Sequence, residues 1–315
     1  MVDVIKRWTL SSEQTALLKE SLPGASPLPD VVKSLFTQHI QEYVLLHKSL
    51  GLPNDREQIL SGCYCYYGCL LLAIIHNKED HKELCSLFTK LYLQVDFYLD
   101  SNTKTTVEKQ ELIKELTLAV ATGKSSSLLP PVRTYIELIT LKPTAKPQLD
   151  AIFFAEVAAA KLENTATSAK STYLESCYRK GGLTVVAILS LFDIVDTGEG
   201  YQVGKCIQLL DDLSDVELDL DSKIHTIATK TLTDEKTLDT LLNTLLQEIN
   251  IIDNRYAVMK AIMTYIVIYL LHKHPNKYPR LKPAKVDNIF EIVLRTFESL
   301  HLTSASNSVC EQTCL

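Results

Sequence analysis

The sequence predicts an all-α protein built as a single helical domain. Apolar residues recur at intervals of three and four in one segment after another, which is the periodicity of an amphipathic helix. The alternation of apolar and polar residues that is typical of strands is weak throughout. Glycine and proline number only 10 and 11 in 315 residues, too few for a β fold with many tight turns. With 46% hydrophobic residues, the chain is long enough to bury a large core.

The predicted helices follow one another between short breakers such as "LPND", "LKPTAKP" and "DTGEG". Their ranges are 29–50, 59–75, 82–100, 106–122, 131–139, 148–161, 165–179, 182–196, 200–220, 234–251, 254–272 and 285–300. No internal repeat divides the chain. We therefore predict one domain over residues 1–302, and we expect residues 303–315 to form a disordered tail.

The charge of the chain, its first residues and its most apolar segment argue against several classes of protein. A net charge of −6 argues against a nucleic-acid-binding protein. The start, "MVDVIKRWTLSSEQ", does not resemble a signal peptide, and the most apolar helix, 256–272, is shorter than the ~20 residues that a bilayer requires. The cysteines of "CYCYYGC" have no Cys/His partners at zinc-finger spacing, so we interpret them as core residues. A cytoplasmic protein without a transmembrane segment is expected.

A row of acidic residues stands out in "QLLDDLSDVELD", residues 208–219. Asp211, Asp215 and Asp219 are spaced four residues apart, which places them on one face of a helix. Like charges at this spacing repel by a few tenths of a kcal/mol per pair. No cation lies within the stretch, and hard divalent ions bind oxygen ligands. We favour a metal site, which Asp212 would join; a solvated acidic face is the alternative.

A second acidic pair, Asp96 and Asp100, has the same spacing at the end of the helix predicted at 82–100. Two helices that carry carboxylates beside apolar residues can face each other across a bundle and hold divalent ions between them. This arrangement suits a diphosphate with an apolar tail, which needs Mg²⁺ at one end and an apolar cavity at the other.

These motifs resemble those of the class I isoprenoid (terpenoid) synthases. "QLLDDLSD" is similar to the second aspartate-rich motif of chain-elongating prenyltransferases, whereas the pattern from Gly204 to Asp219, with "DFYLD" at 96–100, is similar to squalene and phytoene synthases. The combination of "KGG" at 180–182, the acidic helix and "KIHTIAT" at 223–229 most resembles the bacterial large-terpene synthases of the tetraprenyl-β-curcumene synthase type.

The resemblance implies a helical bundle of the class I terpenoid synthase type with a central active-site cavity. It also implies ionisation of a prenyl diphosphate by Mg²⁺ ions, three in number and replaceable by Mn²⁺, followed by cyclisation or rearrangement of the carbocation and release of pyrophosphate. The implied catalytic residues are Asp96, Asp100, Asp211 and Asp215. The implied metal ligands are Asp96, Asp100, Asp211, Asp212, Asp215 and Asp219.

Cationic and polar residues are candidates for binding the substrate. They are Arg179, Lys180, Gln208, Lys223, Arg255 and Tyr256. Arg179 and Lys180 precede two glycines, which either break the helix so that the backbone approaches a ligand or cap the C-terminus of a helix. Arg255 and Tyr256 resemble the Arg-Tyr pair that follows the metal motif in terpene cyclases.

Three classes of function remain open at this stage. The chain is a terpene synthase, which is a lyase; a prenyltransferase that condenses two prenyl units or elongates one; or a helical protein without this chemistry. We leave open whether the chain forms a homodimer. The complete set of acidic residues favours the first two classes.

Overall fold

The computed structural model describes residues 47, 56–100, 104–273 and 275–279. Every regular element in these residues is a helix, and they contain no strand. The predicted all-α class is therefore confirmed. The predicted helices at 29–50 and 285–300 and the tail at 303–315 lie outside the described residues, apart from His47.

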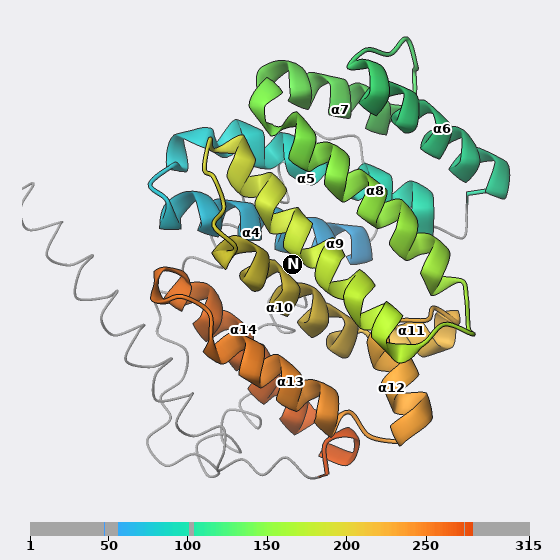
Figure 1. Cartoon of the computed structure of the whole chain (residues 1–315), viewed down its shortest axis with the longest axis vertical. Helices are drawn as coiled ribbons and strands as arrows, with labels where there is room; N and C mark the ends of the chain where they lie inside the picture. Colours follow the sequence, from blue (N-terminus) through green and yellow to red (C-terminus); the bar gives the residue numbers. More distant parts are fainter. Residues whose placement is uncertain (1–46, 48–55, 101–103, 274, 280–315) are drawn as a thin grey trace, which may run out of the picture.

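The helices keep the labels of Figure 1, which begin at α4. Their bounds are α4 Arg56–Ile75, α5 Lys82–Asp100, α6 Thr106–Thr122, α7 Pro130–Leu141, α8 Lys146–Glu163, α9 Lys170–Leu191, α10 Glu199–Ser214, α11 Val216–Ser222, α12 Ile227–Glu235, α13 Asp239–Asn250 and α14 Ala257–Lys273. The helices predicted at 82–100 and 106–122 begin and end where α5 and α6 do. Single-turn 3₁₀ helices at Glu79–His81, Pro143–Ala145, Asn254–Tyr256 and Pro275–Lys277 complete the connections.

Helix α9 lies at the centre of the bundle. It packs against α8 on one side and α10 on the other, and α4, α5 and α12 also contact it. In Figure 1 the helices α8, α9 and α10 run diagonally side by side, with α6 and α7 above them and α13 and α14 below. The hydrophobic core runs through all of these helices and includes the fully buried Leu189 and Leu191 of α9 and Leu209 of α10. This packing places charged residues of four helices, α5, α8, α9 and α10, within electrostatic reach of Tyr92.

The two glycines of "KGG" do not end a helix. Both the predicted break and the predicted C-terminal cap are wrong, and the predicted segments 165–179 and 182–196 are parts of the single helix α9. A Cβ atom added at Gly181 would lie well inside 3.0 Å of the carbonyl oxygen of Gly204 in α10, and one added at Gly182 would meet the ring of Tyr201. The glycines therefore serve the contact between α9 and α10, which offsets the ~1 kcal/mol that each glycine costs inside a helix.

The helix predicted at 200–220 bends at Asp215 and is divided into α10 and α11. The hydroxyl of Ser214 donates a hydrogen bond of 2.8 Å to the carbonyl oxygen of Leu210, a back-bonding contact that bends helices. The amide of Asp215 still donates to Asp211, and that of Asp219 to Asp215, at 3.0 and 2.9 Å. The three aspartates therefore keep their four-residue register across the bend.

Helix α12 was not predicted, and the helix predicted at 234–251 is shorter, because α13 begins only at Asp239. The threonine-rich sequence of α12 has a weak intrinsic preference for the helix. The side chains and backbone amides of Thr226 and Thr229 satisfy each other in a capping box that starts it. Lys236, in the left-handed conformation, ends it.

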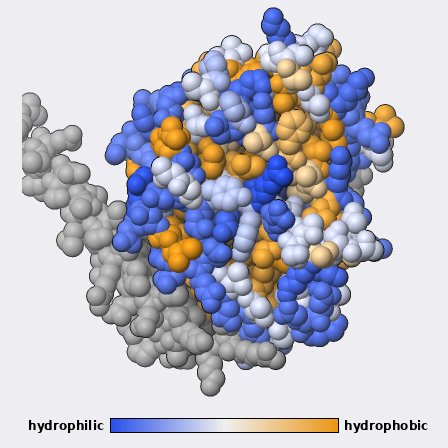
Figure 2. Space-filling view, viewed as in Figure 1, coloured by the Kyte–Doolittle hydropathy of each residue, from blue (hydrophilic) through white to orange (hydrophobic). Residues whose placement is uncertain are grey.

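The surface of the bundle mixes polar and apolar residues. Figure 2 shows hydrophobic side chains over the part of this face that α8 forms, and the α8 residue Phe154 is 46% exposed. In the part of the chain that the structure describes, none of the helices has the length and apolar character needed to cross a membrane. Cys63 and Cys69 are buried and unbonded, as expected for core cysteines.

Candidate functional site

The acidic row lies at the end of α10 and along α11. Asp211 and Asp215 are exposed, Asp219 is half-buried, and Asp212 is buried. The side-chain amide of Gln208 donates hydrogen bonds of 3.2 Å to both Asp211 and Asp212. Gln208, one turn earlier on the same helix, therefore orients two of the carboxylates.

Burial and mutual repulsion raise the pKa values of three of these carboxyl groups. Burial is the largest cause in each case. The pKa of Asp212 rises to about 8, with a further contribution from Asp211. Those of Asp211 and Asp219 rise to about 6 and about 7, and the charge of Asp215 contributes to both. Although Asp211 is open to solvent on one side, protein surrounds it closely enough for burial to dominate. The ionised forms of these carboxyl groups are therefore disfavoured in the metal-free protein.

Tyr92, a residue of α5 one turn before Asp96, is influenced by charges from both acidic motifs. Burial raises the pKa of the Tyr92 hydroxyl well above its ordinary value; the charge of Lys180 opposes the rise, and those of Glu156, Asp96 and Asp211 add to it. Tyr92 is thus within electrostatic reach of carboxylates from α5, α8 and α10. Asp100 is the last residue of α5, and its side chain lies outside what the structure describes.

Lys180 of α9 and Glu156 of α8 form a buried ion pair within this group. The ammonium nitrogen of Lys180 lies 3.1 Å from a carboxylate oxygen of Glu156, and the two side chains are 14% and 13% exposed. The positive charge of Lys180 also lowers the pKa values of Asp211, Asp212 and Cys177 against the larger effect of burial. The cation absent from the acidic segment itself is therefore provided by a neighbouring helix.

A second glutamate of α8, Glu163, lies within electrostatic reach of Asp212 and Asp219. The negative charge of Glu163 contributes to the raised pKa values of Asp212 and Asp219, after the larger effects of burial and of the neighbouring aspartates. The backbone amide of His225 donates to the carbonyl oxygen of Glu163 at 2.9 Å, and the hydroxyl of Thr226 donates to Asp219 at 3.2 Å. The "KIHTIAT" stretch is thus in contact with the acidic row.

Sequence reasoning missed Glu156 and Glu163. They are seven residues apart in "EVAAAKLE", a spacing that places both on one face of α8. Two acids in register on a helix of small apolar residues, the same signal that identified the aspartates, would have found them.

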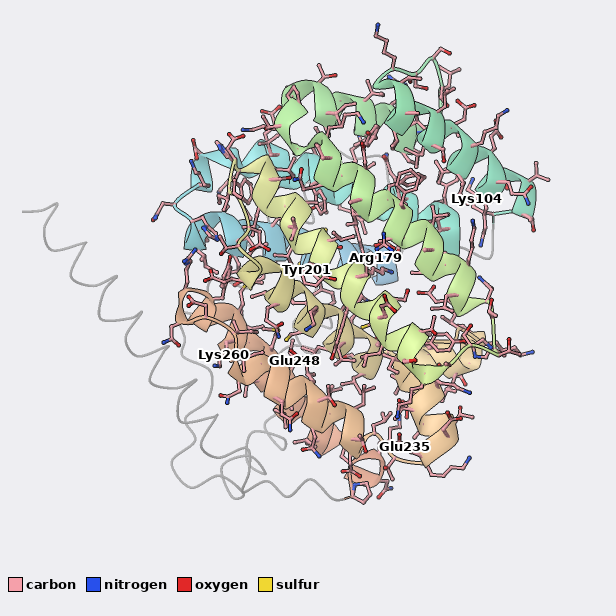
Figure 3. All side chains as sticks on the ribbon, in the orientation of Figure 1. Lys104, Arg179, Tyr201, Glu235, Glu248 and Lys260 are labelled. Atoms are coloured by element: carbon pink, nitrogen blue, oxygen red, sulfur yellow. The ribbon has the colours of Figure 1, made fainter. Side chains whose placement is uncertain are left out.

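Two candidate substrate-binding residues, Arg179 and Lys223, lie at the surface. Arg179 is exposed, and its charge acts on Tyr201 of α10; Figure 3 labels both on the face shown. Lys223 is exposed and caps α11 in the left-handed conformation. Its backbone amide donates to the carbonyl oxygens of Asp219 and Leu220, so Lys223 lies at the end of the acidic row, whereas no contact among the described residues joins Arg179 to the acids.

Arg255 and Tyr256 belong to the opposite end of α10. The guanidinium of Arg255 pairs with Glu199 at 3.4 Å, and the hydroxyl of Tyr256 lies 3.1 Å from the Nε2 atom of His76. Glu199 begins α10 and Asp211 lies near its end, about 18 Å away at 1.5 Å per residue. The expectation that this Arg-Tyr pair joins the acidic site is therefore wrong for this structure.

The donor set suits a hard divalent cation, since it consists of carboxylate oxygens. The arrangement is not a finished coordination site. Among the described side chains, no three His, Cys, Asp or Glu residues lie together in a geometry that would hold an ion. Metal binding would require the side chains of the row to turn toward a common point.

Comparisons with protein-family models, curated proteins and solved structures gave no match to this chain.

Proposed function

We propose that the chain is a Mg²⁺-dependent terpene synthase that ionises a prenyl diphosphate, cyclises or rearranges the carbocation and releases pyrophosphate. The observation that carries the proposal is that acidic residues from two motifs far apart in sequence lie within electrostatic reach of the same buried hydroxyl. Asp96 of α5 and Asp211 of α10 both act on the hydroxyl of Tyr92, beside the ammonium of Lys180.

The residues that would hold the metal ions are Asp96 on one side and Asp211, Asp212, Asp215 and Asp219 on the other; Asp100 is included on its sequence spacing and on the resemblance. When bound, Mg²⁺ would act as a Lewis acid toward the diphosphate leaving group. Gln208 would keep Asp211 and Asp212 oriented, since it bonds to both. Lys180 would present its ammonium group to the anionic end of the substrate as a point charge.

Tyr92, one turn before Asp96 on α5, would present its ring to the apolar part of the substrate. The rings of Tyr92 and Phe88 stack at 6.5 Å between centroids, and Phe88 is almost fully buried. These residues lie one and two turns before Asp96, so this face of α5 leads from the acids into the core. Aromatic faces stabilise cations, and an apolar lining excludes the water that would quench a carbocation.

An assay with purified full-length protein tests the proposal. The protein is incubated with Mg²⁺ and geranyl, farnesyl, geranylgeranyl or longer prenyl diphosphates, and released pyrophosphate and organic products are measured. We expect pyrophosphate release from a single prenyl diphosphate without a second substrate. Turnover that requires isopentenyl diphosphate or a second prenyl unit would identify a prenyltransferase instead. The absence of pyrophosphate release in every combination would reject both enzymes.

A further inference from the structure

The ion pair between Glu156 and Lys180 has an unusual position for a stabilising salt bridge. The two side chains are 14% and 13% exposed, and the loss of hydration of two largely buried charges opposes the gain from their attraction. The pair also lies beside a row of carboxylates that is short of positive charge. Three helices provide the charges: α8 Glu156, α9 Lys180, and α10 Asp211 and Asp212.

The position of Lys180 is fixed by the packing of α9 on α10. Gly181, the next residue along α9, lies against the backbone of Gly204 and the Cβ atom of Gln208. Gln208 in turn holds Asp211 and Asp212 by hydrogen bonds. The base of the Lys180 side chain is thus held close to the helix segment that carries the acids, and Glu156 holds its ammonium end at 3.1 Å.

We propose that Lys180 is a built-in cation that competes with divalent ions for Asp211 and Asp212, and that Glu156 is the partner that offsets part of the Lys180 charge. The inference rests on the proposed function, because it concerns the metal ions expected there. Lys180 balances part of the acidic charge while the protein is free of metal. A divalent ion that binds to Asp211 is repelled by the Lys180 ammonium. The negative charge of Glu156, which is paired with that ammonium, reduces the repulsion.

Mn²⁺ binding to the metal-free full-length protein, without any diphosphate, tests the inference. Free Mn²⁺ is measured by electron paramagnetic resonance for the wild type and for Lys180→Met, Lys180→Arg and Glu156→Gln. Lys180→Met should lower the Kd for Mn²⁺ about tenfold, the size of effect that removing a unit charge ~6 Å from a divalent ion has even in water. Lys180→Arg keeps the charge and should bind Mn²⁺ as the wild type does.

Glu156→Gln should have the opposite effect and raise the Kd, because it removes the partner of the Lys180 charge. Changes of opposite sign separate this role from a purely structural one, which would leave Mn²⁺ affinity unchanged in variants that fold. If Lys180→Met does not fold because it leaves Glu156 buried without its partner, the double variant Glu156→Gln/Lys180→Met removes both charges. It should still bind Mn²⁺ more tightly than the wild type.

The outcomes distinguish the inference from the proposed function. An unchanged or higher Kd in folded Lys180→Met, or in the double variant, overturns the inference, whether or not the wild type releases pyrophosphate. The absence of Mn²⁺ binding in the wild type and all variants overturns the inference, because no ion then competes with Lys180; the proposed function is rejected only by the absence of pyrophosphate release. Tighter binding by Lys180→Met in a protein that turns over no prenyl diphosphate supports the inference and rejects the enzyme.

Discussion

Gly204 of α10 lies directly against the backbone of Gly181 in α9. A Cβ atom added at Gly204 would fall well inside 3.0 Å of the Gly181 carbonyl oxygen, and one at Gly181 would clash with the Gly204 carbonyl oxygen in return. Neither obstacle is a flexible side chain that can turn away. This crossing sets the separation of the two helices that carry Lys180 and the acidic row.

Gly204→Ala should therefore destabilise the protein by about 3 kcal/mol, the upper end of the cost of overpacking, because the two helix backbones must separate. The gain in helix preference of up to about 1 kcal/mol does not offset this cost. Urea denaturation followed by circular dichroism measures the difference. The matched control is Gly68→Ala in α4, where an added Cβ meets no atom within 4 Å. The control should stabilise by about 0.5–1 kcal/mol; equal effects of the two substitutions would contradict the close crossing.

Stability of the metal-free protein should fall as the pH rises from about 4 to 8. The folded-state pKa values of Asp211, Asp212 and Asp219, about 6, 8 and 7, lie above the ordinary value near 3.8. The folded protein therefore binds more protons than the unfolded chain in this range, and stability that is fully present below pH 4 is lost as these groups ionise. We expect a loss of at least about 1.4 kcal/mol, the equivalent of one pKa unit.

Urea unfolding in the presence of EDTA at pH 5 to 8.5 measures this effect, and Asp212→Asn should flatten the curve. Added Mg²⁺ should reduce the loss, because ions bind the ionised carboxylates. A metal-free protein that becomes more stable between pH 5 and 8 would show that these acids are paired with cations.

Asp215→Asn should abolish pyrophosphate release while leaving the metal-free fold as stable as before or more so. Asp215 is exposed at the bend, and its charge raises the pKa values of Asp211 and Asp219. Its loss relieves repulsion of a few tenths of a kcal/mol per pair. Asp221→Asn, an exposed neighbour on α11, is the control that should retain activity. Full activity of Asp215→Asn would remove Asp215 from the site.

Mg²⁺ and inorganic pyrophosphate together should raise the melting temperature more than the sum of their separate effects. Each cancels charge that the other leaves unbalanced, so each binds more tightly when the other is present. Binding to the folded state adds about 2.7 kcal/mol at a hundredfold excess over Kd. Differential scanning fluorimetry with each ligand singly and with both measures the shift. Equal shifts from either alone would indicate binding at separate sites.

Much of the fold follows from local sequence. The helices α5 and α6 are predicted to the residue, because their apolar periodicity is strong and, in α6, the Thr105–Glu108 capping box and Gly123 mark the ends. The continuity of α9 was not predictable, because two adjacent glycines favour a break unless a partner backbone needs their space. That partner, Gly204, comes from a different helix.

In the candidate site, too, the features set by local spacing were predictable and those set by the packing of separate helices were not. The four-residue spacing of Asp211, Asp215 and Asp219 is a local pattern and survives the bend at Asp215. The partial balancing of the acidic charge by Lys180 depends on how α9 packs on α10, and the spacing of the aspartates within their own helix cannot predict that packing. Arg255 failed as a candidate for the converse reason: its distance from the acids is set by the length of α10 and the position where α14 begins.

The hydroxyl of Thr226 has two partners, Asp219 to which it donates and the amide of Thr229 from which it accepts. The start of α12 is therefore tied to the charge of one carboxylate. An ion or proton that binds the Asp219 oxygen would weaken its hydrogen bond from the Thr226 hydroxyl. The Thr226 side chain would then be held less firmly, and the first turn of α12 would open more often. Amide hydrogen exchange at Thr229 would record that opening, so the protein contains its own reporter for the occupancy of Asp219, readable without substrate or label.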